Sequence, residues 1–293
     1  MANGRILRGI GGFYYILPEH GQDVVECKAR GKLRSEKMTP MVGDLVTYEP
    51  QENGQAALES ILPRKNLLIR PPVSNIDQLL IVLSASVPEP DWLLADKLII
   101  QAKMAGIAPF MVLNKCDEQK ADIVSSFLAD YGQHFPCLCV SAETGENIDV
   151  LKDILKGRVS CFSGQSAVGK SSLINAILPG LELETGSLSK KTDRGKHTTR
   201  RAELWPAFGG AVLDTPGFSL FDPELIEQEN LDRCYPEFGK LPSECQFAGC
   251  MHISEPGCAV KNMVKSGGMT ASRYDRYRLL AKEFETRRKH RYD

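Results

Sequence analysis

The chain has 293 residues, of which 42% are hydrophobic and 25% are charged, so it can form two or three packed domains and excludes extended disorder. Its formal net charge of −1 excludes an overall electrostatic attraction to nucleic acid, so local patches must recognise any such partner. The N-terminus lacks a signal-peptide pattern, and no apolar run approaches the roughly 18 residues that span a bilayer. We therefore expect a cytoplasmic protein without a membrane partner.

Residues 1–65 are expected to form a small β-barrel. Short strand-like runs, such as FYYIL at residues 13–17 and DLVTYEP at residues 44–50, alternate with turns that contain glycine or proline, and no helical period appears. Two adjacent prolines, Pro71 and Pro72, then indicate a linker.

Residues 66–221 are expected to form an α/β domain. Apolar strand-like runs alternate with amphipathic helical segments, beginning with a strand at residues 78–85 and a helix at residues 91–106 that Asp91 can cap. This alternation predicts a doubly wound, mostly parallel sheet. Residues 222–293 lack the alternation and are expected to form a third, mostly helical domain.

A phosphate-binding loop is predicted at residues 164–171, where GQSAVGKS fits the pattern GxxxxGK[ST] between a strand and a helix. Its glycines allow backbone N–H groups to turn toward phosphate oxygens, and the helix N-terminus adds a positive potential. Lys170 is expected to reach the β- and γ-phosphates as a catalytic residue, and Ser171 to bind Mg²⁺. The residues expected to contact nucleotide here are Gly164, Gln165, Ser166, Ala167, Val168, Gly169, Lys170, Ser171 and Ser172.

The sequence NKCD, which begins at Asn114, predicts that the base is guanine. It follows an apolar strand, and ligands bind at the carboxyl ends of strands in such sheets. The Asp117 carboxylate can accept hydrogen bonds from guanine N1–H and the exocyclic amine, whereas adenine would leave it unpaired and bind roughly 10⁴-fold more weakly. Asn114 and Lys115 are expected to support the loop and flank the base. Ser141 and Ala142 end the next strand, where a backbone N–H can read guanine O6.

A second segment around the γ-phosphate is expected where DTPG follows the last strand of this domain. Asp214 would hold Mg²⁺ through water, and the N–H of Gly217 would contact the γ-phosphate. Either Thr198 or Thr199 should complete the Mg²⁺ shell when GTP is bound. Spacing alone does not choose between the two threonines, and we favour Thr199.

These motifs occur in an unusual order. In ordinary GTPases the P-loop, the switch threonine and DxxG precede NKxD and SA, whereas here NKxD and SA come first. The site is assembled from strand ends wherever the chain begins, so a circular permutation at surface loops preserves it. The sequence therefore predicts a circularly permuted P-loop GTPase domain.

The residue after DTPG predicts slow intrinsic hydrolysis. Many GTPases place a glutamine there to orient the attacking water, but this chain has Phe218, which can neither donate to nor accept from water. Another residue or a partner must then complete catalysis. His197, beside the threonines, is either that residue or a solvated loop histidine.

A metal site is predicted near the C-terminus, where Cys245, Cys250, His252 and Cys258 form the pattern C-x4-C-x-H-x5-C. Three thiolates and one imidazole complete a tetrahedral Zn²⁺ shell and leave no position for a catalytic water, so the expected role is structural. The spacing is not that of the common zinc fingers, and incidental cysteines are the alternative.

Two basic clusters offer the local charge that an RNA partner requires. The first contains Lys28, Arg30, Lys32, Arg34 and Lys37, and the second contains Arg287, Arg288, Lys289 and Arg291. Each cluster alone is commonly a solvated face. On a small barrel attached to a GTPase, the RNA interpretation gains weight.

The succession NKCD, SA, GQSAVGKS, GKHTT, DTPG and C-x4-C-x-H-x5-C resembles the ribosome small-subunit-dependent GTPase A family (RsgA, also called YjeQ), and the VGD turn at residues 42–44 fits as well. The resemblance covers essentially the whole chain. It implies an oligonucleotide-binding (OB) barrel, a permuted GTPase domain and a C-terminal zinc domain. It also implies GTP hydrolysis stimulated by the 30S subunit, contact with 16S rRNA, a role in late maturation of that subunit, and catalysis by His197. We expect the protein to act as a monomer.

The alternative is a metabolic or signalling NTPase whose flanking domains bind proteins. Stimulation by small ribosomal subunits that salt reduces would support the RNA-binding GTPase, because phosphate contacts weaken with salt. A small-molecule phosphate acceptor would support the alternative.

Overall fold

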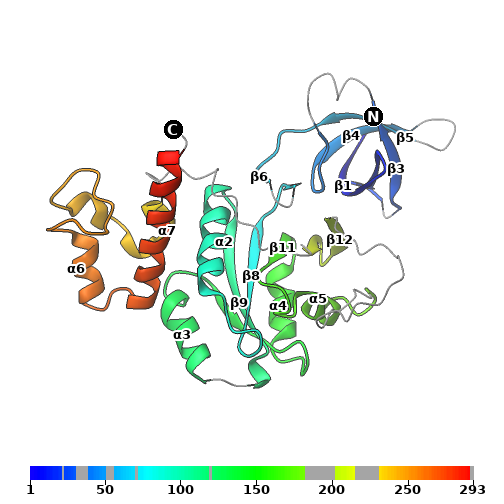
Figure 1. Ribbon diagram of the computed structural model, residues 1–293. Helices are drawn as coiled ribbons and strands as arrows, with labels where there is room; N and C mark the ends of the chain where they lie inside the picture. The colour runs from blue at the N-terminus through cyan, green and yellow to red at the C-terminus, as the bar shows by residue number, and fades with distance from the viewer. Residues whose placement is uncertain are drawn as a thin grey trace.

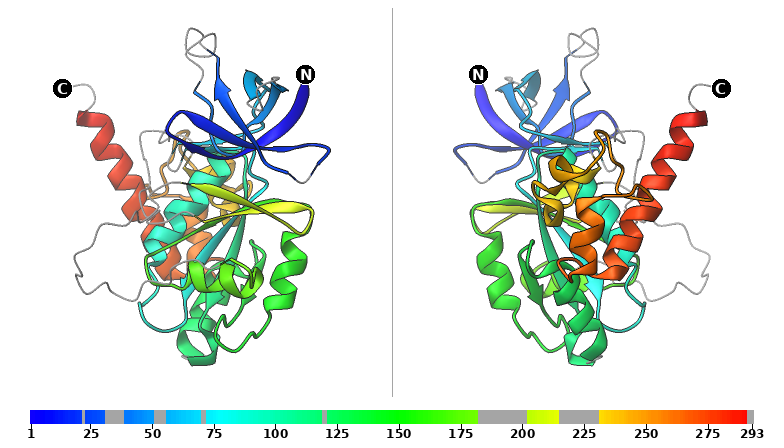
Figure 2. Two further views of the ribbon diagram at one scale, coloured as in Figure 1. Left: turned by 90° about the vertical axis from the view of Figure 1, so that its right-hand side faces the viewer. Right: turned by 90° about the vertical axis from the view of Figure 1, so that its left-hand side faces the viewer.

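The structure is a computed structural model that describes residues 1–21, 23–30, 39–50, 56–69, 72–118, 121–181, 202–214 and 231–290. It has three parts, an N-terminal barrel, a central α/β domain and a C-terminal helical region (Figure 1). The barrel and the C-terminal region lie against different sides of the central domain, as the rotated views in Figure 2 also show. The predicted fold class is thereby confirmed.

The barrel consists of five strands. They are β1 (Ala2–Ile10), β2 (Phe13–Pro18), β3 (Val25–Ala29), β4 (Leu45–Pro50) and β5 (Ala56–Ile61). The barrel closes in the order β1-β2-β3-β5-β4, with β4 paired back to β1. Side chains from alternate positions, including Ile6, Ile16 and Leu58, fill its interior and are fully buried. A closed five-stranded barrel of this kind is the OB-like fold that was predicted.

An ion pair between a buried carboxylate and a partly exposed arginine holds the barrel to the segment that leads into the central domain. The fully buried Asp44 carboxylate accepts hydrogen bonds from Arg64 Nε at 2.7 Å, Arg64 Nη2 at 2.8 Å and Ser74 Oγ at 2.6 Å. Gly43 has φ +92°, and a Cβ at this position would lie 2.1 Å from the Ser74 carbonyl oxygen. The VGD turn therefore needs its glycine for the close approach and its aspartate for the ion pair.

Six strands form the central sheet. In spatial order they are β10 (Cys137–Cys139), β9 (Ala108–Asn114), β8 (Gln78–Ser84), β11 (Val159–Ser163), β13 (Gly210–Asp214) and β12 (Glu203–Ala207). Neighbouring strands are parallel except for β12, which runs antiparallel to β13. Arg8 of the barrel pairs with Glu203 of this edge strand at 2.9 Å. A short ribbon of β6 (Leu67–Leu68) and β7 (Val73–Ser74) precedes the sheet.

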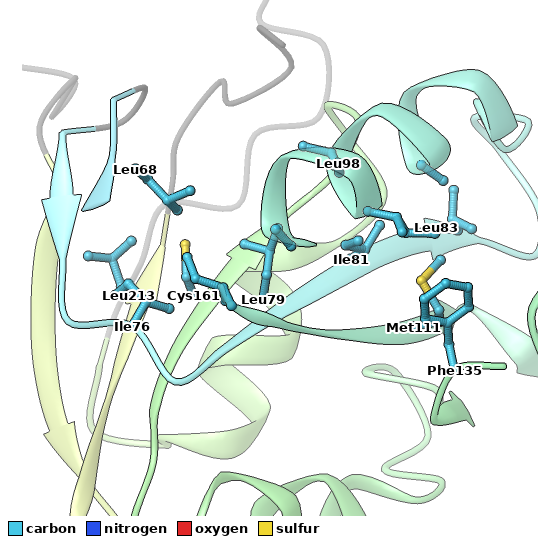
Figure 3. Close-up of a cluster of buried hydrophobic side chains, with 14 of the residues drawn as sticks. Leu68, Ile76, Leu79, Ile81, Leu83, Leu98, Met111, Phe135, Cys161 and Leu213 are labelled. Carbon is cyan, nitrogen blue, oxygen red and sulfur yellow. The ribbon is translucent and has the colours of Figure 1, made fainter. Parts of the chain in front are cut away.

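Helices cover both faces of the sheet. They are α2 (Trp92–Met104), α3 (Ala121–Tyr131), α4 (Ile148–Leu155) and α5 (Lys170–Ile177). Because side chains alternate along a strand, Leu79 and Ile81 of β8 pack with Leu98 of α2 on one face (Figure 3), whereas Leu80 and Val82 pack with α4 and α5 on the other. Burial on both faces explains the continuous apolar run of this strand.

In its described part, residues 231–290, the C-terminal region contains three 3-10 turns and two helices. They are η4 (Asp232–Cys234), η5 (Pro236–Phe238), η6 (Leu241–Glu244), α6 (Ala259–Lys265) and α7 (Ala271–His290). Tyr277 and Leu280 of α7 form a core with Phe238, and Ile100 of α2 joins the same cluster. The region therefore packs directly on α2, beside which α7 lies in Figure 1. In the described part of the chain no helix is both long and apolar enough to cross a membrane.

Candidate nucleotide-binding and metal sites

The predicted P-loop connects the end of β11 to the start of α5. Gly164 has φ +142° and Gly169 has φ +94°. A Cβ at Gly164 would lie 2.2 Å from a carbonyl oxygen of β8, and one at Gly169 would lie 2.4 Å from Asn114 Nδ2, so both positions require glycine. Lys170 Nζ donates hydrogen bonds of 2.8 Å to the carbonyl oxygens of Gly164 and Gln165, which holds its charge over the loop.

The other P-loop residues differ in exposure. Ser166 and Ala167 are exposed at the tip of the loop, whereas Val168 is buried. Ser171 and Ser172 are half-buried in the first turn of α5. The hydroxyl groups and N–H groups of this turn thus lie at the helix N-terminus, where an anion is favoured.

Asn114 connects three loops at the carboxyl edge of the sheet. Its side chain is 1% exposed; Nδ2 donates to the carbonyl oxygen of Val168 at 2.9 Å, and Oδ1 accepts from the N–H of Ala142 at 3.2 Å. Lys115 has φ +64°, and its Nζ donates to the carbonyl oxygen of Ala167 at 3.1 Å. The NKCD loop is therefore attached to both the P-loop and the SA loop. The sequence predicted that these loops lie near one another, because each follows a strand of the same sheet, but it did not predict the bonds between them.

Asp117 lies at the exposed rim of this edge, in the 3-10 turn η1 (Cys116–Glu118). Ser141 is fully buried, and its N–H donates to the carbonyl oxygen of Glu146 at 3.1 Å. The Ala142 N–H also has a partner, because it donates to Asn114 Oδ1. Either N–H could therefore bind guanine O6 only by sharing its hydrogen between that oxygen and its present acceptor. That role remains a prediction.

The loop after β8 joins this edge, although no motif pointed to it. Ser86 Oγ donates to the Glu118 carboxylate, and Lys115 Nζ donates to the carbonyl oxygen of Val87. Ser86 is 5% exposed, whereas Val87 is 71% exposed. In the sequence, only one feature indicated a role for Ser86 and Val87: they follow a strand of the same sheet. Ligand-binding loops lie at the carboxyl ends of such strands.

Two thiols, one in the NKCD loop and one on the neighbouring strand β10, perturb each other's pKa. A hydrogen bond between Cys116 and Cys139 raises the pKa of the Cys116 thiol and lowers the pKa of Cys139 to about 7. Burial raises the pKa of Cys137, on the same strand as Cys139, to about 12. Cys139 is therefore expected to be the more reactive thiol of this strand, because the thiolate is the nucleophile.

Several predicted residues lie outside the described part of the chain. They are His197, Thr198, Thr199, Gly217 and Phe218. The backbone of Asp214 ends β13 and pairs in register with Phe162 of β11, the strand that leads into the P-loop, but its side chain is not among those described.

The four predicted metal ligands meet in one place. The donor atoms of Cys245, Cys250, His252 and Cys258 all lie within 4.8 Å of one another. His252 Nδ1 is 3.5 Å from Cys245 Sγ and 3.4 Å from Cys258 Sγ, and these two sulfurs are 3.9 Å apart. Tetrahedral Zn²⁺, with bonds of about 2.3 Å to sulfur and about 2.0 Å to nitrogen, places sulfurs about 3.8 Å apart and sulfur about 3.5 Å from nitrogen. The donor set and its spacing fit such an ion.

Glu255 orders the chain between two of these ligands. Its carboxylate accepts hydrogen bonds from the N–H groups of Met251 at 2.7 Å, Ile253 at 2.9 Å and Ser254 at 2.9 Å. Burial alone would raise the pKa of Glu255, but these donors lower it below its ordinary value. The sequence pattern did not single out this residue, because its role depends on the path of the backbone.

A P-loop, an NKxD loop and an SA loop that meet at one edge of a mostly parallel sheet define a P-loop GTPase domain, and the order of these loops along the chain makes it a circularly permuted one. The family model described as RsgA GTPase matches residues 61–224, and the one described as RsgA N-terminal domain matches residues 3–58. The chain belongs to the RsgA family of GTPases.

Its relatives are similar over almost their whole length. Two are named "Small ribosomal subunit biogenesis GTPase RsgA". The relative from Caldanaerobacter subterraneus subsp. tengcongensis is 43% identical over 291 residues, covering 99% of this chain and 98% of that protein. The relative from Bacillus cereus is 40% identical over 292 residues, covering 98% of this chain and 99% of that protein.

Two solved structures share the complete fold. YjeQ from Thermotoga maritima is 36% identical and superimposes with a TM-score of 0.85 over 97% of this chain and 98% of its own. YloQ, described as a circularly permuted GTPase, is 33% identical, with a TM-score of 0.81 over 98% of this chain and 96% of its own. The family resemblance predicted from the motifs is confirmed.

Proposed function

We propose that this GTPase binds GTP with Mg²⁺ and hydrolyses it in the biogenesis of the small ribosomal subunit. The observation that carries the proposal is the meeting of three loops at Asn114, because these are the loops of the proposed guanine-nucleotide site and they come from distant segments. The names of the relatives support the choice of subunit. We expect the protein to act late in maturation, in the cytoplasm and as a monomer, with the 30S subunit and its 16S rRNA as partners.

In this proposal the guanine base is recognised at the exposed rim of the sheet. The Asp117 carboxylate accepts from guanine N1–H and the exocyclic amine, and the Lys115 side chain flanks the ring. Asn114 holds both loops in place through its two hydrogen bonds. A buried amide that bridges two loops fixes their separation, and such preorganisation reduces the entropy lost on binding.

The phosphates are held by the P-loop backbone, the N-terminus of α5 and the Lys170 ammonium group. Ser171 and Thr199 are the proposed Mg²⁺ ligands, with Asp214 acting through water, and the ion would neutralise charge on the β- and γ-phosphates. The N–H of Gly217 is proposed to contact the γ-phosphate.

We further propose His197 as the catalytic residue that replaces the missing glutamine. His197→Ala should then lower turnover on saturating 30S subunits and leave GTP affinity nearly unchanged, because the interaction is made mainly in the transition state. Phe218→Ala should reduce turnover less. Wild-type turnover in the His197 variant would contradict this assignment.

The decisive assay is GTP hydrolysis with and without purified ribosomal subunits. The proposal predicts strong stimulation by 30S subunits, little by 50S subunits, and loss of stimulation as salt is raised. Equal rates with and without 30S subunits, together with phosphate transfer to a small molecule, would favour a metabolic NTPase instead.

Base recognition is tested by Asp117→Asn. The amide can donate to the carbonyl that replaces the exocyclic amine in xanthosine triphosphate, so the variant should bind GTP more weakly and xanthosine triphosphate more tightly. Asp122→Asn is a matched control, because Asp122 is exposed on α3 a few residues away. Equal GTP affinity in wild type and Asp117→Asn would remove the guanine-reading role.

We propose that the ion held by Cys245, Cys250, His252 and Cys258 is Zn²⁺ and that its role is structural. All four positions of a tetrahedral shell are filled by protein ligands, so the ion would link the turn around η6 to the start of α6 without supplying a catalytic water. Elemental analysis of protein purified without chelator should find one zinc ion per chain, and its absence would refute this identity.

RNA contact is proposed through the barrel. Exposed Lys28 lies with its Nζ 5.9 Å from the centre of the Phe13 ring, which combines a cation with an aromatic surface. Arg30 is paired with Glu59 at 2.7 Å and Glu49 at 3.2 Å, so its charge is partly neutralised. The other members of this basic cluster, Lys32, Arg34 and Lys37, and the side chains of the C-terminal cluster lie outside the described residues.

A further inference from the structure

Two adjacent loops, the NKCD loop and the loop after β8, lead toward α3 and α2. The loop after β8 continues into α2, and NKCD, after β9, continues toward α3. The two loops are bonded to each other, because the Ala85 N–H donates to the Asn114 carbonyl oxygen at 2.7 Å and Ser86 Oγ donates to the Glu118 carboxylate. The place of Asp117 therefore depends on where these two helices lie.

One arginine of α7 binds both helices. Arg276 Nε donates to Asp96 of α2 at 2.7 Å, and its Nη2 donates to Asp130 of α3 at 2.7 Å. Arg273, one turn earlier, donates to the same Asp96 at 2.5 Å, and the Tyr131 hydroxyl at the end of α3 donates to it at 2.8 Å. A planar guanidinium with its two ends on different helices fixes the distance between them.

These four charged side chains are almost completely buried. Exposure is 1% for Arg273 and Asp96, 8% for Arg276 and 6% for Asp130. Burial alone would lower the pKa of both guanidinium groups, but the charge of Asp96 raises it, so both stay protonated. Apolar residues of similar volume commonly stabilise a buried contact as well as ions do, whereas directional bonds also define one geometry.

We propose that Arg276 is a positioning residue for guanine recognition. By holding α2 and α3 at one separation, it keeps the loops that precede them, and hence Asp117, in the arrangement that reads the base. The C-terminal region then contributes to nucleotide specificity from outside the GTPase domain. This inference rests on the proposed function, because it requires Asp117 to bind guanine.

The test compares GDP and IDP, whose hypoxanthine base lacks the exocyclic amine, by equilibrium titration. Arg276→Gln should weaken GDP binding by about 2- to 30-fold, the range for residues that couple separate sites, and weaken IDP binding less. Its matched control is Arg278→Gln, two residues further along α7, because Arg278 pairs only with Asp275 among the ion pairs of the described residues and is 40% exposed. The control should leave the IDP to GDP ratio of Kd values at the wild-type value.

Asp130→Asn provides a second variant that keeps Arg276 and its bond to Asp96 but weakens the hold on α3. Near-ultraviolet circular dichroism establishes that each variant is folded. In an Asp117→Asn background the effect of Arg276→Gln on the ratio should disappear, since the effect acts through Asp117.

An unchanged ratio in folded Arg276→Gln and Asp130→Asn would overturn the inference, as would equal losses of GDP and IDP affinity. The proposed function has a separate criterion. If Asp117→Asn by itself leaves the preference for GDP unchanged, guanine reading by Asp117 fails, and this inference fails with it.

Discussion

Arg273→Met removes one guanidinium from the interior of the contact between the C-terminal region and the GTPase domain. The Arg273 side chain is 2% exposed and pairs with Glu237, whose side chain is also 2% exposed. Its guanidinium carbon lies 4.7 Å from the centre of the Tyr131 ring and 5.1 Å from that of Tyr235. Methionine can keep much of this packing through its unbranched chain but cannot neutralise the carboxylate.

The expected loss of unfolding free energy is about 3–5 kcal/mol, because a buried carboxylate is left without its cation. Asp96 keeps Arg276 and the Tyr131 hydroxyl as donors, so Glu237 accounts for most of the loss. Replacing both partners, in Arg273→Met/Glu237→Met, should recover most of it, since apolar replacement of a whole buried pair is near neutral. Arg278→Met, at an exposed pair, should cost under about 1 kcal/mol.

Urea unfolding followed by tryptophan fluorescence measures these differences. The chain has two tryptophans, and Trp92 stacks on Tyr131 with ring centres 6.2 Å apart, next to the buried charges. A Trp205→Phe background therefore makes the signal local to this contact. Equal midpoints for Arg273→Met and Arg278→Met would refute the role of the buried charges, and a double variant as unstable as the single one would refute the unpaired carboxylate as the cause.

Other expected outcomes concern the barrel, the thiols and the metal. Asp44→Asn should destabilise the protein by roughly 1–3 kcal/mol in thermal unfolding, because the amide cannot replace the paired carboxylate opposite Arg64. Alkylation of Cys139 by iodoacetamide, measured by peptide mass spectrometry, should accelerate as the pH rises through about 7, because the thiolate fraction then grows. Cys137 should stay unreactive over the same range. Equal labelling of the two cysteines would contradict this expectation. Chelation of the metal should unfold the helices of the C-terminal region, since a structural zinc contributes about 10–16 kcal/mol of apparent folding energy. Nucleotide binding through the phosphate contacts of the P-loop should remain.

The sequence by itself determined the features that short segments encode. Gly164 and Gly169 have the backbone conformations that the P-loop pattern predicts, and Asp91 accepts from the Leu94 N–H at 2.9 Å as the expected cap of α2. The four metal ligands lie within fourteen residues, so their spacing alone brought the donors together. Alternating apolar runs were enough for a doubly wound sheet, because strand and helix periods are local properties.

Only the tertiary structure decided which distant side chains meet. Arg276 pairs with Asp96, 180 residues earlier, and with Asp130, 146 residues earlier. In the sequence both α7 arginines belong to a charged helix that has the composition of a solvated face. Their burial depends on how α7 packs across α2 and α3, and no local period records that packing, because an ion pair across two helices needs only one suitable residue on each. The same holds for Ser86 and Glu118, which become neighbours because β8 and β9 are adjacent strands of one sheet.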